Sequence, residues 1–172
     1  SVPAHIIEQD YLHSLFLSRL YSTPAAMSLV FKGGTCLRLV HKLDRFSEDL
    51  DFSLYQAPEE LRAQFPGLFR AAASSLSFLG IEAAIAKERS ASGSFSCRLR
   101  YAGPLFDGSD LSRGSISIDV SLRDDVFLKP AWALVAPEYP DVPGVRVLCM
   151  QEAEIFSEKL RAIKTVVSCI EK

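Results

Sequence analysis

The sequence has no long apolar run and no excess of charge of either sign. No stretch reaches the roughly eighteen apolar residues that a membrane-spanning helix needs, and no signal-peptide pattern is present. Its 19 basic and 21 acidic residues give a formal net charge of −2, so any contact with nucleic acid would need a local basic patch. We therefore expect a cytoplasmic protein without a membrane partner.

Cysteine is scarce, and its spacing is not that of a metal site. Cys36, Cys97, Cys149 and Cys169 are far apart, with no Cys-x-x-Cys pair and no matching cluster of histidines. Disulfide frameworks and zinc sites usually show such spacings. We therefore expect reduced, mostly structural thiols, and the spacing does not favour a zinc site.

Repeats and low-complexity tracts are absent too, and the composition is that of an ordinary globular protein. Of 172 residues, 48% are apolar and 23% are charged. This length and composition fit one domain with a substantial core, with room for a small helical appendage.

A Gly-Gly-Thr turn stands out in the segment FKGGTCLRLVHKLDRFSEDLDFSL, residues 31–54. Gly33 and Gly34 precede a stretch with apolar residues at helical spacing, and Thr35 is a plausible cap whose hydroxyl could hold an amide or a phosphate oxygen. The first amides of a helix have no partner in the helix, and the helix dipole is positive there. The turn therefore favours an anion such as phosphate, although a Gly-Gly pair alone is usually only a turn.

Two aspartates follow this helix on a predicted strand. Asp49 and Asp51 alternate with Leu50, Phe52 and Leu54, so both carboxylates lie on one face of the strand and the apolar side chains on the other. Neighbouring carboxylates repel each other unless a cation lies between them, and hard oxygen ligands suit Mg²⁺ or Mn²⁺. Together the turn and the aspartates predict a site for a metal-bound polyphosphate.

The remaining pattern predicts an α+β protein with a mixed central sheet flanked by helices. Helices are expected over residues 7–21, 35–43 and 58–79, with an interruption or kink at Pro66-Gly67, and from about residue 151. Strands are expected over residues 29–31, 49–55, 81–89, 94–101 and 115–122, with a short edge strand at 145–148 after an irregular, proline-rich stretch.

Two of these strands carry further polar candidates. Residues 115–122 alternate so that Asp119 is a lone carboxylate among serines on the polar face. Arg98 and Arg100 share a strand face and, with Lys87 and Arg89, could form a basic patch for RNA or phosphate. In both cases the alternative is that these are ordinary solvent-exposed strand residues without a functional role.

The segments Phe31-Lys-Gly-Gly-Thr and Arg45-Phe-Ser-Glu-Asp-Leu-Asp-Phe52 resemble motif I of nucleotidyltransferases with the polymerase-β-like fold. More closely, they resemble the AbiEii/AbiGii toxins, the nucleotidyltransferases of abortive-infection and MenT-like toxin–antitoxin systems. In weaker form the resemblance extends from about Ile6 to Lys164. It implies a nucleotidyltransferase core over residues 1–148 and the start of a C-terminal helical region over residues 149–172.

The resemblance also implies roles for individual residues. A third carboxylate on a neighbouring strand is expected in such enzymes, and Glu158-Lys159-Leu160-Arg161-Ala162 matches a Glu-Lys-Leu-x-Ala helix whose lysine is functional. The implied metal ligands are Asp49, Asp51 and Asp119; the catalytic residues are these three and Lys159; the nucleotide-binding residues are Lys32, Gly33, Gly34, Thr35, Arg45 and Ser47.

The implied reaction moves a nucleoside monophosphate from a nucleoside triphosphate, bound with Mg²⁺ or Mn²⁺, to an acceptor hydroxyl. The acceptor would be a tRNA 3′ end or a protein, and a cognate antitoxin would hold the toxin. Family members usually continue into an Arg-x-x-Lys-Asp segment with another functional aspartate, which this sequence lacks, so we expect a truncated chain or a short member. Two alternatives stay open: a non-catalytic module that binds nucleotide or a partner, and a metal-dependent phosphohydrolase.

Overall fold

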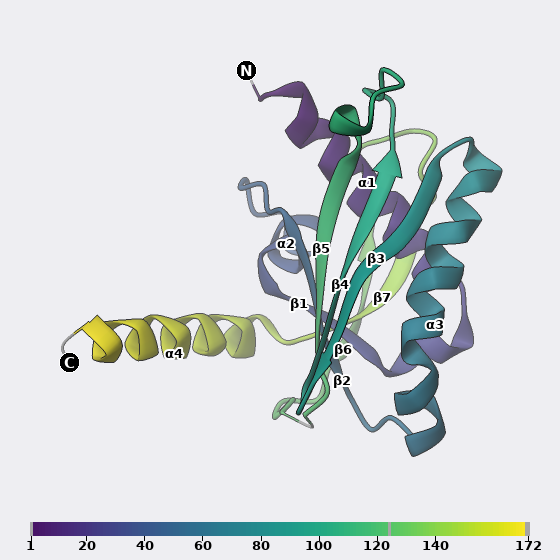
Figure 1. Cartoon of the computed structure of the whole chain (residues 1–172). Helices are drawn as coiled ribbons and strands as arrows, with labels where there is room; N and C mark the ends of the chain where they lie inside the picture. The colour runs from purple at the N-terminus through teal and green to yellow at the C-terminus, as the bar shows by residue number, and fades with distance from the viewer. Residues whose placement is uncertain (1, 124, 171–172) are drawn as a thin grey trace.

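The chain forms one mixed sheet whose apolar face is covered by helices (Figure 1). The computed structural model describes residues 2–123 and 125–170, and the side chains of residues 164–170 lie outside the description. The helices are α1 (Ala4–Leu20), α2 (Gly33–Leu39), α3 (Glu59–Ser75) and α4 (Glu152–Ile170), with 3₁₀ turns at Pro24–Ser28, Leu76–Leu79 and Asp110–Ser112. The strands are β1 (Leu29–Lys32), β2 (Asp49–Leu54), β3 (Glu82–Ala91), β4 (Ser94–Ala102), β5 (Gly114–Ser121), β6 (Ala131–Val135) and β7 (Val145–Cys149).

The strand order places β2 in the interior of the sheet. The seven strands lie in the order β3-β4-β5-β2-β1-β7-β6. β2 is antiparallel to β1 and parallel to β5, and β1 is parallel to β7. As a result Asp51 lies opposite Lys32 on one neighbouring strand and opposite Asp119 on the other.

An aromatic cluster joins α1, α3 and the sheet. The Phe16 and Phe69 rings stack with centroids 6.4 Å apart, and Phe69 also contacts Phe52 of β2 at 5.9 Å and Phe95 of β4 at 6.2 Å. All four side chains are at most 2% exposed. This core covers one face of β2, so the aspartates are left on the other face.

The alternation predicted for three strands is confirmed. Leu50, Phe52 and Leu54 are buried on β2. On β4 and β5 the apolar residues that alternate with the polar ones are buried: Phe95, Cys97, Leu99, Tyr101, Ile116, Ile118 and Val120. The end of the third helical segment is confirmed as well, since Gly80 follows in the left-handed conformation with φ +75°. Of the predicted interruption or kink at Pro66-Gly67, the interruption is wrong, because α3 continues through Pro66.

The prediction for residues 130–148 is partly wrong. β7 is not an edge strand, because it lies between β1 and β6. The proline-rich stretch before it contains β6, whose Trp132 and Leu134 are exposed at the sheet edge. An edge strand is bonded on one side only and therefore tolerates flanking prolines that obscured it in the sequence.

The C-terminal helix begins where the sequence predicted and extends away from the sheet (Figure 1). The buried Glu154 anchors its first turn, accepting hydrogen bonds from the backbone N–H groups of Phe127 (2.6 Å) and Leu128 (3.0 Å). Three apolar residues at helical spacing on α4, Phe156, Leu160 and Ile163, are exposed; the side chains of Val167 and Ile170 lie outside the described residues. In the described part of the chain no helix combines the length and hydropathy needed to cross a bilayer.

Replacing Phe69 should unfold the chain at markedly lower denaturant. Phe69→Ala removes a ring at the centre of the cluster, and such truncations cost about 3–5 kcal/mol. Phe78→Ala is the matched control, because Phe78 is 87% exposed and surface changes stay within about 0.5 kcal/mol. Urea denaturation of both variants measures the difference. Equal losses would contradict this description of the core.

Candidate active site

The Gly-Gly turn lies directly against the aspartates. β1 ends at Lys32, and Gly33 begins α2 with φ +78°, a conformation that side chains rarely adopt. A Cβ on Gly33 would collide with the Asp51 carboxylate, and one on Gly34 would lie 2.6 Å from Ser47 Oγ. Gly33 therefore permits a close approach between the turn and β2, and Gly34 permits one to the segment just before β2.

Thr35 has a different role from the one predicted. Lys32, not Thr35, is the N-cap of α2, and the buried Thr35 hydroxyl donates a hydrogen bond to the Asp49 carbonyl oxygen. The prediction of a cap with a free hydroxyl is therefore wrong. The reason is tertiary: the start of β2 packs against this side chain and takes its hydroxyl as a donor.

Three carboxylates share one face of the sheet. Asp49 and Asp51 alternate on β2, and the parallel pairing with β5 places Asp119 beside Asp51. Burial, followed by the negative charges of Asp49 and Asp119, raises the pKa of Asp51 to about 6. The pKa of Asp119 is also raised, by burial and then by Asp49. A cation between these three carboxylates would relieve their mutual repulsion. Their hard oxygen donors fit Mg²⁺ or Mn²⁺.

Two lysines oppose this negative charge. Lys32 and Lys159 both lower the pKa of Asp51 against its other neighbours. Lys32 is held by an ion pair with Glu158, Nζ to Oε1 3.0 Å, which ties β1 to α4. Lys159 Nζ lies 4.0 Å from the position of a Cβ on Gly34, so α4 brings a cation to the glycine turn.

Most of the predicted residues, but not Gly33 or Thr35, line one of two adjoining cavities. One, of about 350 Å³, is lined by the predicted residues Gly34, Arg45, Ser47, Asp49, Asp51 and Lys159. Lys32 lines the other, together with Asp51 and Asp119. Arg123 also lines that second cavity, and Glu158 positions Lys32. The sequence assigned a role to neither residue. Glu158 stood in the Glu-Lys-Leu-x-Ala motif, but only the lysine of that motif was given a role, and nothing in the sequence distinguished Arg123.

The predicted basic patch is partly assembled. Lys87, Arg89 and Arg98 line a cavity that reaches Asp119 from the β3–β4 side of the sheet. Arg100 lies apart from it, because its guanidinium pairs with Asp110 at 3.2 Å.

Asp51→Asn should stabilise the metal-free protein at alkaline pH. The folded-state pKa of about 6 lies above the ordinary value of an aspartate. Between about pH 4 and pH 6, folded Asp51 therefore holds a proton that the unfolded chain has released. Stability is therefore lost as the pH rises from about 4 through about 6, by about 2–3 kcal/mol. Urea denaturation in EDTA at pH 4 and pH 8 should show similar stability for the two proteins at low pH and a more stable variant at high pH. A less stable variant at pH 8 would contradict the electrostatic description.

Gly33→Ala should damage both fold and site, because alanine disfavours φ +78° and its Cβ collides with Asp51. We expect a loss of more than about 1 kcal/mol together with a weaker Mg²⁺-induced thermal shift. Gly67→Ala is the control: Gly67 lies in α3 with no atom near its would-be Cβ, so alanine should stabilise by about 0.5–1 kcal/mol. An unchanged Gly33→Ala protein would argue against the close approach of turn and strand.

Comparison with solved structures finds this fold in longer chains. JHP933 from Helicobacter pylori is 22% identical with a TM-score of 0.59, over 93% of this chain and 58% of that one. MenT4, nucleotidyltransferase toxin Rv2826c from Mycobacterium tuberculosis H37Rv, is 24% identical with a TM-score of 0.57, over 92% of this chain and 54% of that one. The chain thus spans little more than half the length of these proteins.

None of the curated proteins compared with the chain matches it. A family model does: the one described as nucleotidyl transferase AbiEii toxin, type IV TA system, matches residues 15–167. The predicted family and α+β nucleotidyltransferase fold are therefore confirmed. The chain belongs to the AbiEii family of nucleotidyltransferase toxins.

Proposed function

We propose that this chain transfers a nucleoside monophosphate from a nucleoside triphosphate to an acceptor hydroxyl. The observation that carries the proposal is the arrangement of three carboxylates on one sheet face, with a glycine turn against one of them and a lysine from α4 beside that turn. Membership in the AbiEii family supports the same reaction.

The triphosphate would lie in the cavity between α2, the start of β2 and α4. The backbone amides of Gly33 and Gly34 suit the β- and γ-phosphates, and Lys159 and Arg45 supply positive charge on the same side. A Mg²⁺ or Mn²⁺ ion held by Asp49, Asp51 and Asp119 would neutralise charge on the phosphates during transfer. The ion pair with Glu158 keeps Lys32 at the edge of this site, where it faces Asp51.

The proposed reaction is an in-line displacement. The acceptor oxygen attacks the α-phosphorus and forms a new P–O bond, while the bond to the bridging α–β oxygen breaks and pyrophosphate leaves. The proton of the acceptor hydroxyl needs a nearby base, and Asp119, which lies beside Asp51 on β5, is the proposed one. The protein contributes chiefly positioning and electrostatic stabilisation.

The acceptor would approach from the β3–β4 side. Lys87, Arg89 and Arg98 line the cavity that ends at Asp119, so a polyanion lying there would present its terminal hydroxyl to the carboxylates. This arrangement favours RNA, such as a tRNA 3′ end, over a neutral protein segment. A cognate antitoxin is the partner that the family implies.

Asp49→Asn should reduce transfer at least about a hundredfold while leaving the protein folded, because one charge that holds the cation is lost. The assay follows α-labelled ATP, CTP, GTP and UTP, each in turn, onto total tRNA in Mg²⁺. Glu60→Gln, an exposed carboxylate change on α3, is the control and should transfer normally.

Three other outcomes have distinct meanings. Label on protein but not on RNA would change the acceptor and keep the reaction. Release of nucleotide without any labelled acceptor would identify a phosphohydrolase. Nucleotide binding that Asp49→Asn weakens, without turnover, would identify a binding module and overturn the proposed transfer.

A further inference from the structure

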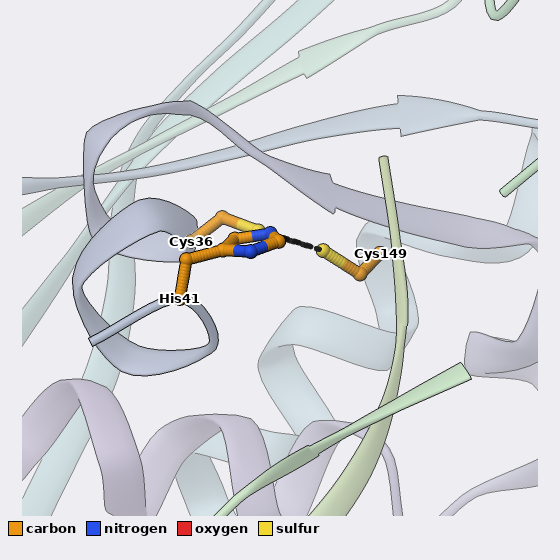
Figure 2. A group of neighbouring side chains, drawn as sticks. All are labelled: Cys36, His41 and Cys149. Carbon is orange, nitrogen blue, oxygen red and sulfur yellow. Dashed lines mark hydrogen bonds between the residues drawn. The ribbon is translucent and has the colours of Figure 1, made fainter. Parts of the chain in front are cut away.

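Three soft or borderline metal-ligating side chains converge beside α2 (Figure 2). Cys36 lies in α2, His41 follows that helix, and Cys149 is the last residue of β7. The two sulfurs are 2.9 Å apart, and Cys149 Sγ is 3.9 Å from His41 Nε2. All three donor atoms lie within 4.8 Å of one another.

The sheet brings these residues together from distant parts of the sequence. β7 runs parallel to β1, with Cys149 opposite Phe31, and α2 follows directly after β1. The end of β7 and the first turns of α2 are therefore neighbours. Within the described residues, no other trio of histidine, cysteine or carboxylate donors has its ligand atoms this close together. The three aspartates of the candidate active site lie farther apart from one another.

The donor chemistry is that of a zinc ligand set. Thiolate and imidazole bind Zn²⁺ tetrahedrally, with Zn–S of about 2.3 Å, which puts two coordinated sulfurs ~3.8 Å apart. The present sulfurs would separate by somewhat less than an ångström, which side-chain rotation can supply.

The position of His41 between the sulfurs and a carboxylate favours a metal site over a simple pair of thiols. Its Nδ1 lies 3.9 Å from Glu152 Oε2, on the side away from the sulfurs. Metal-bound histidines commonly donate their second ring N–H to a carboxylate, and Glu152 stands near that nitrogen, although 3.9 Å is longer than a hydrogen bond. A disulfide or a buried thiol pair requires neither group.

The site is closed on one side and accessible on the other. Cys36 and Cys149 are at most 4% exposed, whereas the side chains of His41 and Glu152 are 30% and 56% exposed. An ion could therefore enter past His41, with water as a fourth ligand.

We propose that Cys36, His41 and Cys149 bind one thiophilic divalent cation, Zn²⁺ in the first place, with Glu152 supporting His41. The ion would join α2, immediately after the glycine turn, to the end of β7 that leads into α4. It would hold the turn and the helix that carries Lys159 in a fixed relation. Binding replaces thiol protons, which are released to solvent. This site does not depend on the proposed transfer reaction.

The test is titration of the full chain, reduced and stripped of metal, with Co²⁺ and then Zn²⁺. We expect one equivalent of Co²⁺ to give the visible bands of a tetrahedral ion and a thiolate-to-cobalt charge-transfer band, which Zn²⁺ abolishes. The thermal midpoint should rise with Zn²⁺. Glu152→Gln should weaken binding about 10–100-fold, as for other supporting carboxylates.

Variants separate this site from others. His41→Ala changes a partly exposed side chain, so it should fold and bind Zn²⁺ more weakly than Glu152→Gln does. Cys149→Ser should abolish the charge-transfer band. Cys97→Ser, a buried thiol on β4, and Asp49→Asn, in the carboxylate site, should leave the band unchanged.

The proposal is overturned if the reduced protein shows no charge-transfer band, or if His41→Ala binds as tightly as the wild type. A Cys36–Cys149 disulfide in protein isolated without reductant, together with no metal uptake after reduction, would overturn it in favour of a redox pair. If the wild-type protein binds Co²⁺ as expected but shows no transfer activity, only the proposed function is refuted.

Discussion

Repulsion between carboxylates on adjoining strands is the constraint on which the rest of this site depends. The parallel pairing of β2 with β5 places Asp51 beside Asp119, and the alternation of β2 adds Asp49 to the same face. Burial of Asp51, followed by the negative charges of Asp49 and Asp119, raises its pKa. The strands stay in this register despite the repulsion, because the opposite face of β2 is packed into the aromatic cluster around Phe69.

α2 separates two environments with different chemistry. Its Thr35 hydroxyl donates to the Asp49 carbonyl, on the side of the hard oxygen ligands. The next residue, Cys36, contacts Cys149 and so belongs to the soft sulfur cluster. Because both residues follow the glycine turn immediately, a change in either environment would be felt where the phosphates are proposed to lie. Glu158 and Lys32 add a third tie, from β1 to α4.

Much of the fold followed from local patterns. The alternation in β2, β4 and β5 identified their buried faces, and it placed Asp119 on a polar face before its partner strand was known. The prolines before β7 concealed β6, since local composition does not reveal a strand that gains its partner from an edge. The cap assigned to Thr35 was wrong for a related reason: the hydroxyl is occupied by a residue of the next strand.

The sequence by itself determined the periodicities, the glycine turn and the two aspartates, because side-chain direction along a strand or helix depends only on spacing. The tertiary structure decided which of these features meet. Strand order alone places Asp119 beside Asp51 and brings Cys149 to Cys36 across 113 positions, and α4 alone brings Lys159 to Gly34. Contacts of this kind depend on how the sheet is assembled, which no local spacing encodes.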